Sequence, residues 1–206
     1  MTPPPASSPL DEGHDRLPVL TLDMDGVFCS PFFGWNAGIS STFLDPDAPP
    51  RPASVPPAWL RRVVDPVRFN PRRPLPDARG ALARLHEVRQ LVVVTGRRSY
   101  PQWWLRRHGL LPFFDRIMVN EGPLRSPHYK LEALDLLGAA EHIDDDPRTA
   151  QLLAQRSRAQ IYLRNWPTNR RAELDPRVQR VDDLHQLADI LGAPRLDAPR
   201  LDDPGR

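Results

Sequence analysis

The stretch LPVLTLDMDGV, residues 17–27, decides how this chain is expected to fold. Its first part is a short run of apolar and β-branched residues that ends at Leu22, a composition typical of a strand buried inside a sheet. Asp23, Asp25 and Gly26 come directly after this run. Because ligands of parallel α/β sheets bind beyond the ends of the strands, the two carboxylates predict a sheet edge that carries chemistry.

Downstream of residue 75, further apolar runs alternate with segments of helical periodicity. The expected strands are residues 90–95, 116–119, 141–143 and 160–163, and the expected helices lie at about 77–87, around 103–105, at 129–137, from 147 and at 183–191. Strands that alternate with helices of this length are joined by right-handed crossovers, and they form a parallel sheet covered on both faces. The fold class is therefore expected to be α/β.

Proline divides the chain into regular and irregular parts. Sixteen of the 26 prolines lie in the first 76 residues. We expect residues 1–16 and 193–206 to be disordered tails, since they are rich in polar residues and proline. Between them, a single α/β domain is expected over 17–192, with residues 27–75 as a proline-rich flap or minimal cap inserted after the first strand.

Composition excludes several classes of protein. Hydrophobic residues make up 40% and charged residues 26% of the chain, so a core can be buried. The longest strongly apolar stretch, residues 91–94, is far shorter than the roughly 20 residues that cross a bilayer, so no membrane partner is expected. No secretory signal is expected at the start of the sequence. Cys29 is the only cysteine, which excludes internal disulfides and multi-cysteine metal sites and favours a cytoplasmic location.

The basic residues are almost all arginine. Only Lys130 is a lysine among 28 basic residues, and the formal net charge is +2. Arginine pairs recur along the chain, for example at 61–62, 97–98 and 106–107. A nucleic-acid-binding surface would produce such pairs, but acidic residues are interleaved with them, so nucleic acid is not the expected partner.

The carboxyl ends of the expected strands carry polar residues that meet at one edge. They are Asp23 and Asp25 after the first strand, Thr95 and Gly96 after the second, Asp144 and Asp145 after the fourth, and Lys130 on the helix before the fourth. Four carboxylates at one edge repel one another unless a hard cation lies among them, and oxygen ligands favour Mg²⁺. A hydroxyl, a backbone N–H and an ammonium suit a phosphate group.

These motifs, in this order and strand context, resemble those of the haloacid dehalogenase (HAD) superfamily. The resemblance rests on residues 22–27 (LDMDGV), 93–96 (VVTG), Lys130 and 143–145 (IDD), and it extends from residue 19 to about 165. It implies a HAD-like Rossmannoid fold of three layers with a central parallel sheet. It also implies phosphoryl chemistry, because the dehalogenase and ATPase branches of the family have other residues where this chain has Asp25.

The resemblance implies a role for each residue. Asp23 would be the nucleophile that forms an aspartyl-phosphate, and Asp25 would protonate the leaving oxygen and then activate water. Thr95 and the Gly96 N–H would bind phosphoryl oxygens, and Lys130 would offset their charge. Mg²⁺ would be held by the Asp23 carboxylate, the Asp25 carbonyl and Asp144, while Asp145 would bind through water or orient a ligand. Asp146 would cap the next helix.

The function expected from this resemblance is a Mg²⁺-dependent phosphomonoester hydrolase that acts on a small-molecule phosphate ester. Two alternatives stay open. A HAD enzyme of the 5′-nucleotidase type is one, because DMDGV and the segment RNWPTN at 164–169 are loosely similar to segments of such enzymes. A non-catalytic protein that binds phosphate or nucleic acid through its arginines is the other. Nothing in the sequence indicates the natural substrate or the oligomeric state.

Overall fold

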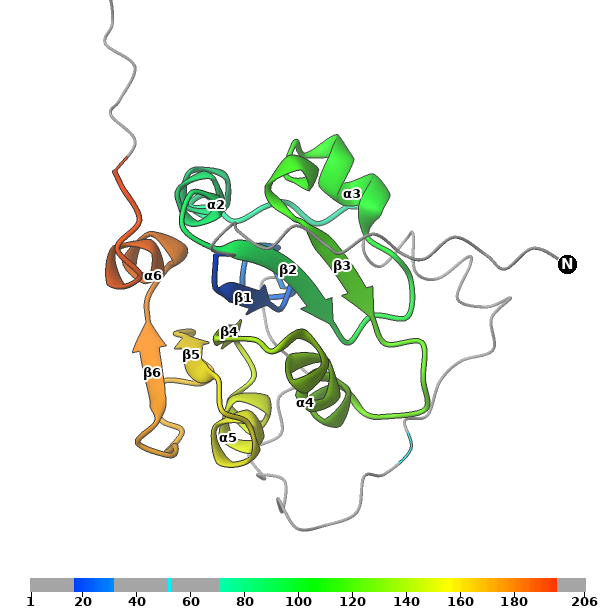
Figure 1. The fold of residues 1–206 in the computed structure, drawn as a ribbon, viewed down its shortest axis with the longest axis vertical. Coiled ribbons are helices and arrows are strands. Elements are labelled where there is room, and N and C mark those ends of the chain that lie inside the picture. The colour runs from blue at the N-terminus through cyan, green and yellow to red at the C-terminus, as the bar shows by residue number, and fades with distance from the viewer. Residues whose placement is uncertain (1–16, 32–51, 53–70, 196–206) are drawn as a thin grey trace, which may run out of the picture.

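The computed structural model describes residues 17–31, 52 and 71–195 (Figure 1). The expected N-terminal tail, most of the expected flap and the expected C-terminal tail from residue 196 lie outside the described residues. Among the described residues, no helix has the length and apolar character needed to cross a membrane.

A six-stranded parallel sheet forms the centre of the fold, in the order β3-β2-β1-β4-β5-β6. The strands are β1 Val19–Leu22, β2 Gln90–Thr95, β3 Arg116–Val119, β4 Glu141–Asp144, β5 Gln160–Arg164 and β6 Val178–Val181. The register pairs Leu22 with Val93 on one side and with Ile143 on the other, so β1, β2 and β4 end at the same edge. The chain turns to opposite sides of β1, which makes this edge the topological switch point where ligands of such sheets bind.

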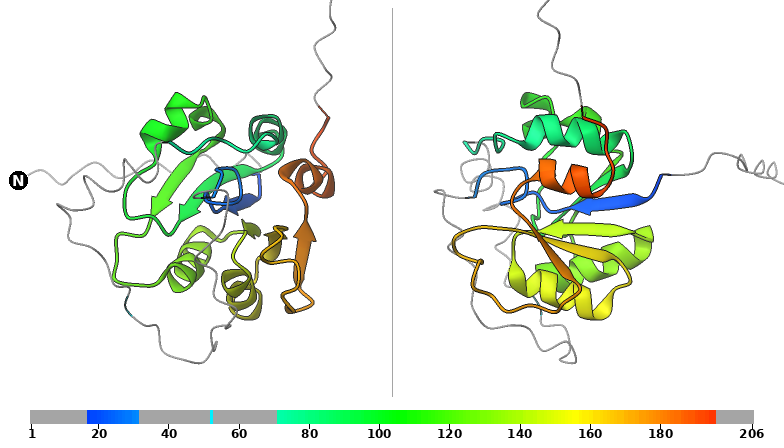
Figure 2. Two further views of the ribbon diagram at one scale, coloured as in Figure 1. Left: turned by 180° about the vertical axis from the view of Figure 1, so that it is seen from behind. Right: turned by 90° about the vertical axis from the view of Figure 1, so that its left-hand side faces the viewer.

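Helices cover both faces of the sheet. They are α2 Ala78–His86, α3 Gln102–Arg107, the 3-10 turn η2 Leu111–Phe113, α4 Ser126–Leu137, α5 Pro147–Arg156 and α6 Leu184–Ile190. Figures 1 and 2 show α2, α3 and α6 on one face and α4 and α5 on the other. The three-layer α/β fold expected from the sequence is confirmed.

Alternating side chains of the central strands supply the two cores. In β2, Leu91 and Val93 belong to the core under α2 and α6, whereas Val92 and Val94 pack with Ala133 of α4. This explains the unbroken apolar sequence of β2, since a strand covered on both faces has no solvent-facing positions. The larger core also holds residues of the motif after β1, including Met24 and Val27, and this packing fixes the loop that carries Asp23.

Three features of the fold differ from the sequence-based expectation by more than one residue at an element's end. β6 was not expected, because VQRV is short and polar and pairs with β5 alone at the sheet edge. α4 begins at Ser126 rather than near 129, since a proline in the first turn, here Pro127, lacks only an N–H that needs no helical partner. Ala193, expected in the C-terminal tail, is 7% exposed, and its carbonyl accepts a hydrogen bond from Arg84.

Asp77 links three elements that lie far apart in the sequence. Its carboxylate accepts hydrogen bonds from both terminal nitrogens of Arg164, at 2.8 and 3.0 Å, and from the Leu184 N–H at 2.8 Å. It thereby joins the start of α2 to the end of β5 and the start of α6. Burial opposes ionisation, but these hydrogen bonds and the Arg164 charge outweigh it and hold the pKa of Asp77 below its usual value.

We expect Asp77→Asn to lower the free energy of unfolding at neutral pH by about 3 kcal/mol, because it leaves Arg164 buried without its countercharge. The folded-state pKa of Asp77 is depressed, so its stabilisation is present above about pH 4 and is lost as the pH falls through the folded-state pKa. Urea unfolding of both proteins from neutral to acid pH measures this. Asp189→Asn, at a carboxylate that is 45% exposed, is the control and should change stability less. Parallel pH profiles for wild type and Asp77→Asn would contradict the assignment.

Candidate active site

The ends of β1 and β4 bring three of the expected carboxylates together. Asp23 follows β1, Asp144 ends β4 and Asp145 comes next, and one oxygen from each lies within 4.8 Å of the others. A hydrogen bond of 3.0 Å from the Asp23 N–H to the Ile143 carbonyl continues the pairing of the two strands beyond β1. All three aspartates are buried, so their charges interact in an environment that water screens poorly.

Lys130, the single lysine, lies between two of these carboxylates. Its Nζ is 3.1 Å from Asp23 Oδ1 and 2.7 Å from Asp144 Oδ2, and its side chain is 3% exposed. Burial alone would lower the pKa of the ammonium, but the charges of Asp144 and Asp23 outweigh it and hold the pKa above its usual value. The ammonium is therefore a fixed positive charge beside the expected nucleophile.

Asp144 is hydrogen-bonded at both oxygens. Oδ1 accepts the backbone N–H groups of Asp145 and Asp146 at 2.9 and 3.0 Å. Oδ2 faces Lys130 Nζ and, at 3.3 Å, the Nε2 atom of the buried His142. Although burial opposes ionisation, Lys130 and His142 outweigh it, so the pKa of Asp144 lies below its usual range. His142 was not among the expected site residues, because the histidines of the sequence show no ligand spacing.

The carboxylates carry more negative charge than Lys130 balances. Burial is the largest cause that raises the pKa of Asp23 to about 7; the neighbouring carboxylates add to it and Lys130 opposes it. Burial and the charges of Asp144 and Asp23 also raise the pKa of Asp145. An excess of buried negative charge on carboxylate oxygens fits a hard divalent cation.

Gly26 permits the loops after β1 and β4 to touch. Its φ is +75°, in the left-handed region that glycine adopts without strain. A Cβ atom at this position would lie 1.8 Å from Oδ2 of Asp145. Glycine is thus required here both for its backbone conformation and for lack of space. The Asp145 carboxylate lies directly against the DMDG loop.

Two arginines bind Asp25. Arg97 Nε donates to Asp25 Oδ2 at 3.0 Å, and the terminal nitrogens of Arg97 and Arg72 both contact Asp25 Oδ1. Burial opposes ionisation, but Arg97 and Arg72 together hold the pKa of Asp25 below its usual value. The Asp25 side chain is 30% exposed, against 9% for Asp23, so Asp25 is the more accessible of the two carboxylates to solvent.

Neither arginine was among the expected site residues. Arg97 directly follows Gly96, so its position beside the phosphate loop was a usable signal. Arg72 comes from the end of the proline-rich insertion, where the sequence shows no regular pattern. Its carbonyl accepts a hydrogen bond of 2.9 Å from Trp104 Nε1, and the next carbonyl, of Arg73, accepts one of 2.9 Å from the Ser30 N–H. These backbone contacts hold Arg72 over the site.

Thr95 and Gly96 lie at the end of β2, beside β1, as expected from the sequence. Thr95 is 1% exposed, and its Oγ1 accepts a long hydrogen bond of 3.4 Å from the Arg97 N–H. A Cβ atom on Gly96 would lie 2.4 Å from Ser126 Oγ, so a glycine is needed where this loop meets the first turn of α4. Asp146 caps α5 through a 3.0 Å hydrogen bond from the Arg148 N–H, and its expected capping role is confirmed.

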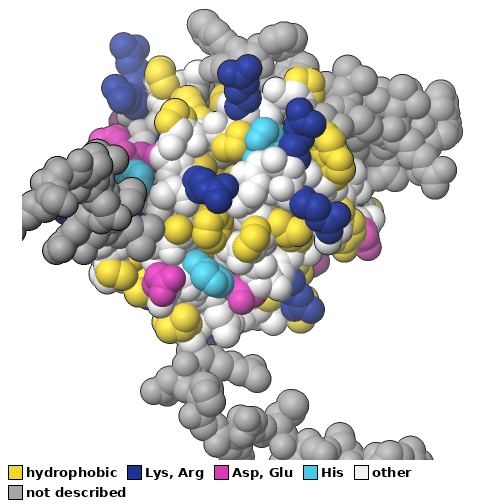
Figure 3. Space-filling model, turned by 90° about the horizontal axis from the view of Figure 1, so that it is seen from above, with side chains coloured by type: hydrophobic (Ala, Val, Ile, Leu, Met, Phe, Trp, Pro, Cys, Tyr) yellow, Lys and Arg dark blue, Asp and Glu magenta, His cyan; other side chains and the backbone are white. Residues whose placement is uncertain are grey.

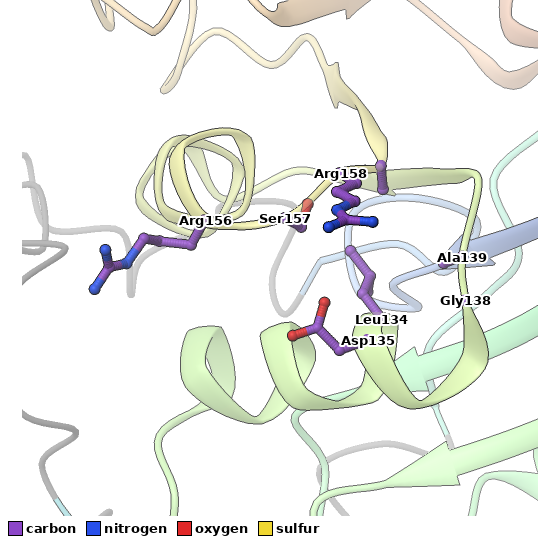
Figure 4. A pocket seen from close by; sticks show the side chains of 8 residues that line it. Leu134, Asp135, Gly138, Ala139, Arg156, Ser157 and Arg158 are labelled. Carbon is purple, nitrogen blue, oxygen red and sulfur yellow. The ribbon is translucent and has the colours of Figure 1, made fainter.

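A pocket at the opposite end of the sheet is separate from this cluster (Figure 4). It lies between the last turn of α4 and the turn from α5 into β5, and it is lined by Leu134, Asp135, Gly138, Ala139, Arg156, Ser157, Arg158 and Ala159. These segments precede β4 and β5, whereas the carboxylates follow β1 and β4. None of the expected site residues lines this pocket.

The described surface seen in Figure 3 mixes charges of both signs. On this face, the Lys and Arg side chains stand apart from one another, with hydrophobic and acidic side chains between them. A continuous basic stripe, which is the usual electrostatic footprint of nucleic-acid binding, is not seen among the described residues of this face.

Comparison with known proteins identifies the class of fold. No family model matches the sequence, and no curated protein matches it. A HAD phosphatase from Thermococcus onnurineus superposes with a TM-score of 0.56 at 14% identity, over 87% of this chain and all of that chain. A haloacid dehalogenase-like family hydrolase from Streptococcus pneumoniae gives 0.55 at 17%, over 84% of this chain and 98% of that one.

A third structure agrees with these two. A HAD-superfamily hydrolase of subfamily IA from Geobacter sulfurreducens gives a TM-score of 0.53 at 16% identity, over 84% of this chain and 99% of that one. The chain therefore has the fold of the HAD-like hydrolases, as the resemblance of its motifs predicted.

Proposed function

We propose that the protein is a Mg²⁺-dependent phosphomonoester hydrolase that acts on small phosphate esters through an aspartyl-phosphate on Asp23. One observation carries the proposal. At the switch point of a HAD-like sheet, a buried carboxylate with an ammonium 3.1 Å away lies among two further carboxylates. A second acidic residue, Asp25, follows two positions later and is more exposed. This arrangement supplies a nucleophile, charge neutralisation and a proton-transfer group in one place.

In the first step an oxygen of Asp23 attacks phosphorus, and the bond from phosphorus to the ester oxygen breaks as the new bond forms. Thr95 and the Gly96 N–H bind the phosphoryl oxygens, and Lys130 offsets their charge. Asp25 gives a proton to the leaving oxygen and, in the second step, takes one from the water that hydrolyses the aspartyl-phosphate. Arg72 and Arg97 stabilise its carboxylate form, which is the form that the second step uses, so proton donation in the first step requires that substrate binding weakens these contacts.

Asp23, Asp145 and the Asp25 carbonyl would hold Mg²⁺ in this proposal. When bound, the ion supplies neutralisation of the charge on the nucleophile and on the phosphoryl group. The sequence-based expectation made Asp144 a metal ligand, and its contacts favour another role for it. Its oxygens accept two backbone N–H groups and face Lys130 and His142, so we propose that it positions Lys130 and that Asp145 is the direct ligand.

Three broader expectations remain proposals. The flap over residues 27–75 is one, because 32–51 and 53–70 lie outside the described residues. A cytoplasmic location is another, and the single buried Cys29 is compatible with it. A small-molecule substrate is the third.

Removal of the metal is expected to abolish hydrolysis. Purified full-length protein should hydrolyse p-nitrophenyl phosphate with Mg²⁺, lose this activity with EDTA and regain it when Mg²⁺ is restored, because the buried carboxylates need a cation before they can accept a phosphate dianion. An aryl ester is the first choice, since its leaving group needs little help from Asp25. A screen of nucleotides, sugar phosphates and phosphorylated acids then distinguishes a nucleotidase from a broader phosphatase.

Two outcomes of this experiment would contradict the proposal. Equal hydrolysis with and without EDTA would contradict the metal requirement. Failure to hydrolyse any phosphate ester, combined with binding of nucleic acid that weakens steeply with salt and ignores Mg²⁺, would favour the non-catalytic alternative.

A further inference from the structure

The loop that follows β5 contacts the backbone of both acidic loops. We define it as the 164–169 loop, RNWPTN. Trp166 Nε1 donates to the Gly26 carbonyl at 2.9 Å, and Asn169 Nδ2 donates to the Asp145 carbonyl at 2.9 Å. The loop thus joins the segment that carries Asp23 and Asp25 to the segment that carries Asp145. The first contact spans 140 positions of the sequence and the second spans 24.

Asn169, the last residue of this loop, makes hydrogen bonds through both the nitrogen and the oxygen of its side-chain amide. It is 1% exposed, and its Nδ2 also donates to the Arg164 carbonyl at 2.8 Å. Its Oδ1 accepts the Trp166 N–H at 2.8 Å. One amide therefore fixes the shape of the 164–169 loop and holds the Asp145 carbonyl. A side chain that cannot donate twice would lose at least one of these two buried hydrogen bonds.

The two contacts hold one carbonyl on each of the two acidic loops, Gly26 on one and Asp145 on the other. Gly26, whose carbonyl Trp166 holds, is the residue whose missing side chain admits Asp145 Oδ2. Arg164 adds a third contact by donating to the Val27 carbonyl at 2.7 Å. Small movements of either backbone would change the distance between the carboxylates of Asp23 and Asp145.

We propose that Asn169 and Trp166 are positioning residues for the metal site: they hold the loops after β1 and β4 at the separation at which Asp23 and Asp145 bind one Mg²⁺. This inference rests on the proposed function, because it requires that the carboxylate cluster binds the ion. Mg²⁺ demands near-ideal octahedral geometry, so its affinity is sensitive to displacement of its ligands. Loss of groups that orient metal ligands typically costs about 10- to 100-fold in affinity.

Mg²⁺ affinity, measured by isothermal titration calorimetry on the full chain, tests the inference without reference to activity. Asn169→Ala should weaken Mg²⁺ binding by about tenfold or more. Trp166→Phe keeps an aromatic ring but removes the N–H donor together with part of the indole, so it should weaken binding by a smaller factor of about 3 to 10 and should fold even if Asn169→Ala does not.

Two matched variants serve as controls. Asn165→Ala makes the same change in the same loop, but the Asn165 side chain bonds Asp182 and Arg180 rather than an acidic loop of the site. Trp103→Phe makes the other change at an α3 residue that is 52% exposed. Both should bind Mg²⁺ as the wild type does.

The outcomes separate the inference from the function on which it rests. Wild-type protein that binds no Mg²⁺ at millimolar concentration would overturn the proposed metal-dependent function, and the inference with it. The inference alone would be overturned if the wild type binds Mg²⁺ and both Trp166→Phe and a folded Asn169 variant bind it with the same affinity as the wild type. Equal losses in the control variants would also overturn it, because the effect would then not come from the two loop contacts.

Discussion

Asp23→Asn is expected to remove hydrolysis of p-nitrophenyl phosphate, with a fall in kcat of roughly 10⁴-fold or more, as when a nucleophile is removed from other enzymes. The amide has nearly the shape of the carboxylate, but its oxygen is a poor nucleophile and a weaker metal ligand. The fold should survive, because the change takes one negative charge out of a buried cluster in which carboxylates repel one another. Steady-state kinetics and the melting temperature measure the two effects.

A second measurement tests the covalent step directly. Acid quenching during turnover should trap a phosphorylated wild-type protein and none with Asp23→Asn. Asp146→Asn is the matched control, since it makes the same change in the neighbouring acidic loop at a helix cap, where asparagine caps about as well as aspartate. Wild-type kcat in the Asp23 variant, or loss of activity in both variants alike, would contradict the assignment of the nucleophile.

The sequence was sufficient for most of the sheet, because β1, β2 and β5 are largely apolar runs that a polar residue ends or follows. β2 shows this best: its five apolar or β-branched residues after Gln90 are buried on both faces, and no helix of that length would begin and end so sharply. β6 escaped prediction for the converse reason. Its sequence, VQRV, has two polar residues, and its pairing with β5 depends on a turn whose path no local pattern encodes.

Only some of the site residues could be predicted from the sequence. Residues that directly follow strands, such as Asp23 and Asp144, are placed by the sheet itself, and a sequence pattern finds them. Arg72 and Asn169 are placed by contacts across the fold. Arg72 reaches Asp25 from 47 positions away, and Asn169 reaches the Asp145 carbonyl from 24 positions away. Such contacts depend on loop paths, which hydrophobic periodicity does not determine.

Lys130→Arg is expected to lower kcat at least tenfold, and by as much as about 10² to 10³, the usual cost of losing one well-placed transition-state contact. The substitution keeps the charge. In the wild type, however, the ammonium lies 3.1 Å from Asp23 Oδ1 and 2.7 Å from Asp144 Oδ2, and the side chain is only 3% exposed. A guanidinium is planar and wider than an ammonium. It cannot contact both carboxylates from the same point without displacing one of them.

The kinetic and structural consequences of this substitution can be separated. Overpacking a buried position costs about 1 to 3 kcal/mol, so the melting temperature should fall by a few degrees while the protein stays folded. Lys130→Met keeps most of the length of the side chain without its charge, and it should lower kcat further because Asp23 and Asp144 then repel each other without an ammonium between them. If Lys130 were an ordinary surface lysine, both variants would turn over like the wild type. Because the chain has no other lysine and this one lies between the expected nucleophile and the carboxylate that positions it, wild-type kinetics in a folded Lys130→Arg protein would contradict the proposed charge balance of the whole site.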